Sequence, residues 1–163
     1  MNTINKEDQA LFRSTVEGNA PIDKDAAQHT KKNNQQNAFT AYSYITEANL
    51  TGSDIVFQAQ SGVSPKILKK MKQGNIGGVV ALDLHGQTVI EACESMSAFM
   101  HEHQHEQFVH IIHGKGYHSE NSMSVLKTQV VSFLNQHPQV MAITSCPEKD
   151  GGTGAVFALL KQI

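Results

Sequence analysis

The sequence predicts an α/β protein, a two-layer β-α-β-α-β-β sandwich with a mixed four-stranded sheet, preceded by a polar N-terminal extension. From Val79 onward, short apolar runs alternate with segments in which apolar residues recur at helical spacing. Helical crossovers join the first strand to the second and the second to the third, which makes these three strands parallel. Residues 147–154 are too few for such a crossover, so the last strand is expected to run antiparallel to the others.

The first 75 residues are expected to form an extension of short helices and flexible linker, and residues 76–163 the folded domain. Asn5 can cap a short helix that ends at Gly18. Residues 21–40 are polar and nearly free of large apolar side chains. They cannot bury enough surface to offset the entropy cost of ordering them, so we predict a linker there.

A second short helix in the extension is predicted to begin at Pro65, because proline suits the first helical position, and to end at Gly74. Its apolar side carries Ile67, Leu68 and Met71. The opposite side is basic and is a candidate surface for nucleic-acid phosphates, the alternative being a solvated helix face. The basic residues are Lys66, Lys69, Lys70 and Lys72.

Four apolar runs of the domain are predicted to be strands, and two amphipathic helices connect the first three. Thr88 and Glu91 form a capping box at the start of the first helix. The second helix is expected to be capped near Asn121 or Ser122 and to be ended by Pro138. The last strand is continuously apolar, which predicts a place inside the sheet rather than at its edge. The strands are residues 79–84, 108–112, 140–146 and 155–161.

Three short motifs each lie beside a predicted strand, and all three fall on one edge of the sheet. Open α/β sheets place their sites where strands give way to loops. If the first two strands are neighbours, about 4.8 Å apart, a histidine from each can reach one substrate atom. The motifs are LDLHG at 82–86, HGKG at 113–116 and GGTG at 151–154.

Asp83 and His85 are the strongest candidates for catalysis. One residue separates them, so in an extended strand their side chains share a face. A carboxylate that accepts a hydrogen bond from one imidazole nitrogen fixes the tautomer and leaves the other nitrogen able to exchange a proton. The alternative is that both side chains only satisfy amides of the loop.

The other two motifs are candidates for a second proton transfer and for phosphate binding. His113 could exchange a proton, and Lys115 adds a cation. Gly114 and Gly116 permit positive φ, and consecutive amides in such a turn can form an anion-binding nest. For the third motif, a wide turn into the last strand is the alternative to phosphate binding. Its residues are Gly151, Gly152, Thr153 and Gly154.

Composition and charge limit the class of protein. The formal net charge of −2 excludes a generally basic nucleic-acid binder but leaves room for a local basic patch. Two cysteines are too few for a disulfide framework, and Cys93 is expected to be a small buried hydrophobe. No apolar run approaches the roughly 20 residues of a membrane span, and no signal segment is evident, so we expect a soluble cytoplasmic protein. His101, His103 and His105 do not converge at helical spacing, and we predict a solvated helix end rather than a metal site.

Taken together, the motifs LDLHG, HGKG and GGTGA resemble the Smr (small MutS-related) domain over residues 79–163. The segment from Glu7 to Arg13 and the lysine-rich stretch 66–74 resemble the extension of stand-alone bacterial Smr proteins. The resemblance implies a two-layer fold similar to the C-terminal domain of translation initiation factor three, with the last strand antiparallel and inside the sheet.

The resemblance also implies an activity, because the family includes DNA-nicking and RNA-cleaving members and some that act on messenger RNA at stalled or collided ribosomes. Asp83 and His85 match the family's catalytic motif. His113, Gly114 and Gly116 match its second motif. Residues 117–122 look longer than the usual turn before the second helix.

The predicted function is therefore an endonuclease that cleaves nucleic-acid phosphodiester bonds, with RNA favoured on chemical grounds and DNA nicking, with a divalent metal, left open. The 2′-hydroxyl of RNA is a built-in nucleophile, so a base, an acid and a cation suffice, and no cofactor is expected. Hydrolysis of DNA needs an external water molecule, which is usually activated by bound divalent metals. Asp83 and Asp150 would provide few carboxylate ligands for such metals. Two alternatives stay open: a non-catalytic module that binds nucleic acid or the ribosome, and a metal-dependent phosphoesterase of small molecules.

Overall fold

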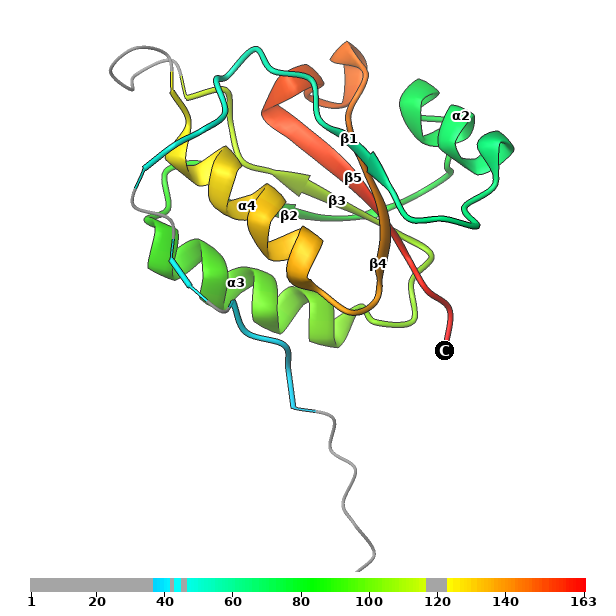
Figure 1. Cartoon of the computed structure of the whole chain (residues 1–163), viewed down its shortest axis with the longest axis horizontal. Coiled ribbons are helices and arrows are strands. Elements are labelled where there is room, and N and C mark those ends of the chain that lie inside the picture. The colour runs from blue at the N-terminus through cyan, green and yellow to red at the C-terminus, as the bar shows by residue number, and fades with distance from the viewer. Residues whose placement is uncertain (1–36, 42, 45–46, 117–122) are drawn as a thin grey trace, which may run out of the picture. The chain divides into compact units, whose positions relative to one another are not determined.

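A five-stranded mixed sheet forms the centre of the structure, a computed structural model that describes residues 37–41, 43, 44, 47–116 and 123–163. The helix predicted from Asn5, most of the predicted linker, and the loop 117–122 lie outside the described residues. The strand order is β1-β4-β5-β3-β2 (Figure 1). The strands are β1 (Phe57–Ala59), β2 (Val80–Asp83), β3 (Phe108–Ile112), β4 (Val140–Ser145) and β5 (Ala155–Leu160).

The predicted topology is confirmed. β2 and β3 are parallel neighbours, whereas β5 pairs antiparallel with both β3 and β4 and lies inside the sheet. The sheet has one strand more than the four predicted, because β1 pairs antiparallel with the outer side of β4. β1 is only three residues long and belongs to a region expected to hold only short helices and linker. A segment this short carries too little periodicity to identify it as a strand.

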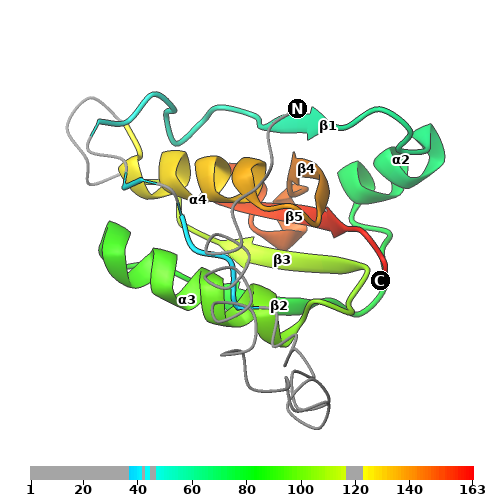
Figure 2. The same ribbon diagram turned by 60° about the horizontal axis from the view of Figure 1, so that its bottom comes forward.

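Helices cover both faces of the sheet. α3 (Val89–Glu102) and α4 (Val125–Gln136) lie side by side on one face, and α2 (Pro65–Gln73) lies on the other (Figures 1 and 2). The larger core lies beneath α3 and α4 and contains Met96, Phe99, Ile111, Phe133 and Leu134. The smaller core lies beneath α2 and is built around Met71, Cys146 and Phe157.

The helix ends follow from the local sequence. The Thr88 hydroxyl accepts a hydrogen bond from the Glu91 backbone N–H, and the Glu91 carboxylate accepts one from the Thr88 backbone N–H, which completes the predicted capping box of α3. α2 begins at Pro65 and ends at Gly74, whose φ of 69° suits glycine. The prediction for α4 is wrong by two residues or more, since Ser124 rather than Asn121 or Ser122 caps it.

The described part of the extension packs on the domain. The Phe39 ring lies 5.3 Å from the Phe133 ring, edge to face, and the Phe39 carbonyl accepts a hydrogen bond from the Ser97 hydroxyl. Val56 is buried in the larger core. Phe39 falls at the end of the stretch predicted as linker, so one aromatic ring anchors that end. The boundary at residue 76 stays a prediction.

Two short 3₁₀ turns connect β4 to β5, Glu148–Asp150 and Gly152–Gly154. They bring the third motif back to the end of the sheet where β2 and β3 terminate. Of the helices in the described part of the chain, none is long and apolar enough to cross a membrane.

Candidate active site

Asp83 and His85 form a hydrogen-bonded pair at the end of β2. The Asp83 carboxylate accepts from His85 Nδ1 at 2.7 Å and from the His85 backbone N–H at 3.0 Å. The backbone bond in particular lowers the pKa of Asp83 below its usual range, against the opposing effect of burial. With Nδ1 facing a carboxylate, the proton sits on Nδ1 and the lone pair on Nε2, as a general base requires.

The pair lies on an edge strand and is open to solvent. The side chains of His85 and Asp83 are 75% and 50% exposed. Asp83 is paired with Ile112 on β3, which is paired with Ala155 on β5, and aligned residues share a sheet face. Ile112 and Ala155 belong to the core beneath α2, so Asp83 lies on the α2 face.

His113 ends the neighbouring strand, β3, in a very different environment. Only 3% of the residue is exposed. Its Nδ1 donates to the Gly114 carbonyl at 2.7 Å, and its Nε2 has no hydrogen-bond partner among the described residues. Burial lowers the pKa of His113 to about 4, so the ring is neutral near pH 7. The expectation that both histidines exchange protons with one substrate atom does not fit this burial.

A pocket of about 650 Å³ joins the two histidine motifs. The N-termini of α3 and α4 border it, at Thr88 and Ser124. Helix N-termini carry partial positive charge and unpaired N–H groups, so they favour anions. The residues that line the pocket are His85, Gly86, Gln87, Thr88, Val89, His113, Gly114, Lys115, Gly116, Ser124, Val125 and Leu126.

The second motif forms one wall of this pocket. Gly114 has a φ of 79°, which glycine adopts without strain, and a side chain there would come within 3.9 Å of His85 Cβ. Gly116 lies so close to Ser124 that a Cβ would sit 3.0 Å from its hydroxyl. Lys115 adds a cation whose Nζ is 3.9 Å from the Glu148 carboxylate. The glycines thus let the backbone approach both the first motif and the cap of α4.

The third motif supports the second motif from behind. The Gly154 carbonyl accepts hydrogen bonds from the backbone N–H groups of His113 and Gly114, at 3.0 and 2.9 Å. A Cβ at Gly154 would lie 2.9 Å from Lys115 Cγ and 3.3 Å from the Gly114 carbonyl carbon, so a larger residue there would displace the second motif. The Glu148 carboxylate lies over Gly152, which does not suit a phosphate. Gly154 therefore acts as a scaffold for the second motif, and the phosphate-binding role expected for residues 151–154 stays a prediction.

Lys127, which the sequence analysis did not single out, stabilises the segment 51–54, which adjoins the second motif. This fully buried lysine donates to the backbone carbonyls of Thr51 and Gly52 at 3.1 and 3.3 Å, and also to that of Asp54. Gly52 in turn contacts the Lys115 carbonyl. Lys127 occupies a position on the apolar face of α4, four residues before Val131. A lysine within an apolar helix face was the sequence signal that could have identified it as a buried residue.

The four lysines of α2 are exposed and lie away from the pocket, over the other sheet face from α3 and α4.

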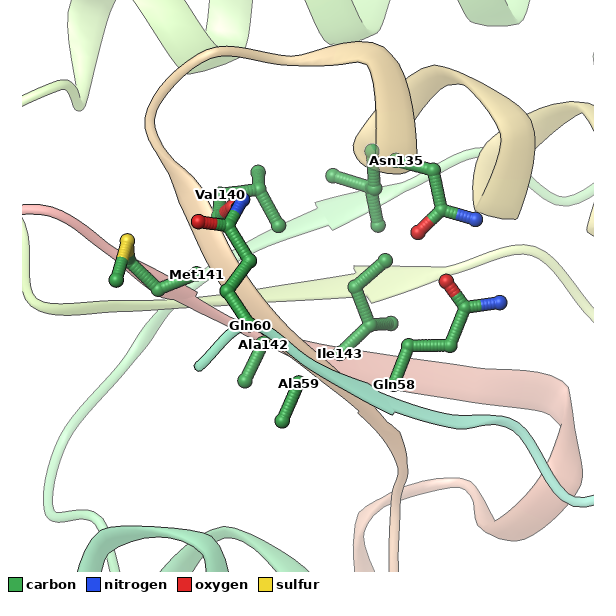
Figure 3. Close-up of a pocket in the computed structure, with 9 residues that line it drawn as sticks. Gln58, Ala59, Gln60, Asn135, Val140, Met141, Ala142 and Ile143 are labelled. Carbon is green, nitrogen blue, oxygen red and sulfur yellow. The ribbon is translucent and has the colours of Figure 1, made fainter. Parts of the chain in front are cut away.

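His101, His103 and His105 do not come together: within the described ranges, no group of three or more His, Cys, Asp or Glu side chains could hold a metal ion. A second hollow, of about 400 Å³, lies between β1, the start of β4 and the end of α4. The Gln58 and Asn135 amides extend to the same side of this hollow (Figure 3). Because β4 runs parallel to β2 and β3, its start lies at the opposite end of the sheet from the histidine motifs.

Comparison with known proteins agrees with this architecture. Residues 82–161 match the Smr domain. The chain is 30% identical to the ribosome rescue factor SmrB of Salmonella paratyphi B and to that of Salmonella newport, over 98% of this chain and 92% of each relative. It also resembles the crystal structure of YdaL, a stand-alone small MutS-related protein from Escherichia coli, with a TM-score of 0.64 and 22% identity over 78% of this chain and 98% of that one.

Proposed function

The chain belongs to the Smr domain family, and from this premise we propose that it is an endonuclease that cleaves RNA at the Asp83–His85 pair. The observation that carries the proposal is the 2.7 Å contact between Asp83 and His85 at the mouth of a pocket bordered by two helix N-termini. A base with a defined tautomer stands beside a site that favours an anion. Phosphodiester chemistry needs both.

In the proposed reaction, His85 Nε2 takes the proton from a 2′-hydroxyl. That oxygen attacks the adjacent phosphorus, the bond from phosphorus to the 5′-oxygen breaks, and the leaving oxygen takes a proton from water, to which the exposed pair is open. The products are a 2′,3′-cyclic phosphate and a 5′-hydroxyl. Asp83 stabilises the imidazolium that forms. Because the nucleophile belongs to the substrate, the proposal includes no metal cofactor.

The rest of the pocket supports the phosphate. Lys115, the Gly116 N–H and the N-terminus of α4 can stabilise the negative charge that develops on the phosphoryl oxygens. We assign His113 a positioning role instead of the acid role expected from the sequence. Its Nδ1–H fixes the Gly114 carbonyl and thereby the conformation of the second motif.

We propose that the natural substrate is messenger RNA on the ribosome. The support is the name of the relatives, ribosome rescue factor, and the near full-length alignment with them. DNA nicking is the less favoured activity, because hydrolysis of DNA requires an activated external water. A non-catalytic binding module is the alternative of another class, and the exposed lysines of α2 would suit it equally.

A cleavage assay on matched RNA and DNA oligonucleotides, with and without EDTA, tests the proposal. We expect cleavage of RNA that resists EDTA and is lost in both Asp83→Ala and His85→Ala. If the two variants bind RNA like the parent and the parent does not cleave, the protein is a binding module. If cleavage persists unchanged in both variants, the pair is not the active site.

A further inference from the structure

A partly exposed phenylalanine lies beside the basic helix, at the edge of the sheet opposite to β2. Phe57 of β1 is 44% exposed, and Lys72 Nζ lies 3.8 Å from the centre of its ring. Together with Pro65, Leu68 and Lys69 it lines a groove of about 450 Å³. An exposed aromatic ring among lysines is the combination with which proteins bind single-stranded nucleic acid: the ring stacks on a base and the cations contact phosphates.

We propose that Phe57, Lys69 and Lys72 bind a nucleotide of the single-stranded RNA that flanks the cleavage site. The ring accepts a base, which displaces the Lys72 ammonium from the ring face to a phosphate. This inference rests on the proposed function for the identity of the strand. It adds an RNA-binding site, centred on Phe57, that is separate from the histidine motifs.

The register of the sheet places this groove on the same sheet face as Asp83. Phe57 is paired with Thr144, Thr144 with Phe157, Phe157 with His110, and His110 with Ala81. Aligned residues point to one face, so Phe57 and Ala81 share it, and so does Asp83 two residues further along β2. Four strand spacings and two residues separate Phe57 from Asp83, which is about 20 Å.

α2 lies across this same face, between the two edges. Its side chains Ile67, Leu68 and Met71 pack on the sheet, and its lysines are exposed. The end of the helix leads toward the active site: a Cβ at Gly74 would lie 3.0 Å from Lys149 Cε, and Lys149 follows Glu148, whose carboxylate faces Lys115. A strand that starts at Phe57 and crosses α2 therefore approaches Asp83 over a surface that offers five lysines, Lys66, Lys69, Lys70, Lys72 and Lys149.

Charge argues for nucleic acid over a protein as the occupant. The chain as a whole has a net charge of −2, yet α2 carries four lysines and no acidic residue. Concentrating positive charge on one helix of an otherwise acidic protein favours a polyanion at that helix. The apolar lining of the groove comes from three side chains, Phe57, Pro65 and Leu68, which is far less than a stable protein interface buries.

The test uses Phe57→Trp in an Asp83→Ala background, which prevents cleavage. The chain contains no tryptophan, so the substituted indole is the sole indole reporter. Titration with a single-stranded RNA of about ten nucleotides should quench its fluorescence saturably, because stacked bases quench indoles. Tyr44→Trp is the matched control: Tyr44 is 53% exposed and adjoins Ser43, which contacts Gln129 on α4, on the other side of the sheet. Absence of quenching at position 57, or equal quenching at position 44, overturns the proposal.

Three further variants separate stacking from simple apolar contact and from charge. Phe57→Leu keeps an apolar residue against α2 but removes the ring, and we expect it to weaken binding of the same RNA by about 10-fold, whereas Phe57→Tyr binds like the parent. Replacing Lys69 and Lys72 by Gln should reduce the slope of log affinity against log salt by about 1.4. A Leu variant that binds as tightly as the parent overturns the stacking role.

Cleavage distinguishes failure of this site from failure of the proposed function. Phe57→Leu should slow cleavage of a long RNA but leave cleavage of a substrate of two or three nucleotides unchanged, because the short substrate cannot reach the groove. Equal rates of the variant and the parent on the long RNA overturn the groove and leave the endonuclease proposal intact. The fluorescence titration measures binding alone, so it decides the groove even if the parent cleaves nothing.

Discussion

The two histidine motifs end neighbouring parallel strands, yet the fold gives them opposite environments. His85 follows the edge strand β2 and is largely exposed, with its Nδ1 tied to a carboxylate. His113 follows β3, which lies between β2 and β5, and it is buried with its Nδ1 tied to a backbone carbonyl. A carboxylate partner stabilises an imidazolium, whereas burial disfavours one. This difference is the reason why we propose proton transfer for the edge histidine and positioning for the interior one.

The largest expected effect on cleavage comes from removing His85, the exposed histidine of the two. His85→Ala should lower kcat/KM for RNA cleavage by at least about 100-fold, because it removes the general base, while the thermal stability stays close to that of the parent. His105→Ala is the control, since His105 is also exposed but lies beyond the end of α3. A His85→Ala variant with near-normal kcat/KM would remove this residue from the mechanism.

Replacing the buried Lys127, which supports the pocket through residues 51–54, should instead lower both stability and activity. Lys127→Met leaves the carbonyls of Thr51 and Gly52 without their donor, and we expect the free energy of unfolding to fall by about 2 kcal/mol. Cleavage should fall as well, because Gly52 contacts the Lys115 carbonyl. Urea denaturation measures the loss of stability. Initial rates of RNA cleavage, measured where the variant is fully folded, give the loss of activity. Lys161→Met, at an exposed position, should change neither, and unchanged stability in Lys127→Met would show that the lysine does not hold the 51–54 segment.

The pH dependence of stability tests whether His113 is neutral. Its pKa in the folded protein is about 4, as is that of His137, in both cases chiefly because of burial, whereas an unfolded histidine has a pKa of about 6.5. Below pH 6.5 the unfolded chain binds protons that the folded protein does not. The unfolding free energy should therefore fall between about pH 6.5 and 4, by up to about 1.4 kcal/mol per pH unit for each histidine.

Urea titrations across that pH range, repeated for His113→Gln and His137→Gln, provide the measurement. Each variant should show a shallower decline than the parent. If His113→Gln declines as steeply as the parent, the ring of His113 is charged in the folded protein, and the contrast with His85 would not hold.

Local signals in the sequence were enough for most of the fold. The Thr88–Glu91 capping box, Pro65 and Gly74 mark helix ends because the physics that fixes them involves residues only a few positions apart. Connection lengths were enough to orient the last strand, since a short loop cannot make a crossover. β1 escaped prediction because three residues pair with β4 more than 80 positions away.

The candidate site was predictable in its position and less so in its roles. Asp83 and His85 are two residues apart, so their pairing follows from the sequence, although the structure was needed to show it. The burial of His113 depends on what lies on both sides of β3, which no local pattern contains. The same holds for Lys127, whose partners are backbone carbonyls some 75 residues earlier in the chain.

The measurement that tests the central claim most directly is the chemistry of the ends produced from an RNA and from the same RNA with one 2′-deoxy sugar at the mapped cleavage position. If His85, oriented by Asp83, activates the 2′-hydroxyl, the RNA gives 2′,3′-cyclic phosphate and 5′-hydroxyl ends, and the deoxy substitution abolishes cleavage at that position. Products with 5′-phosphate ends, or unchanged cleavage at the deoxy sugar, would contradict the account.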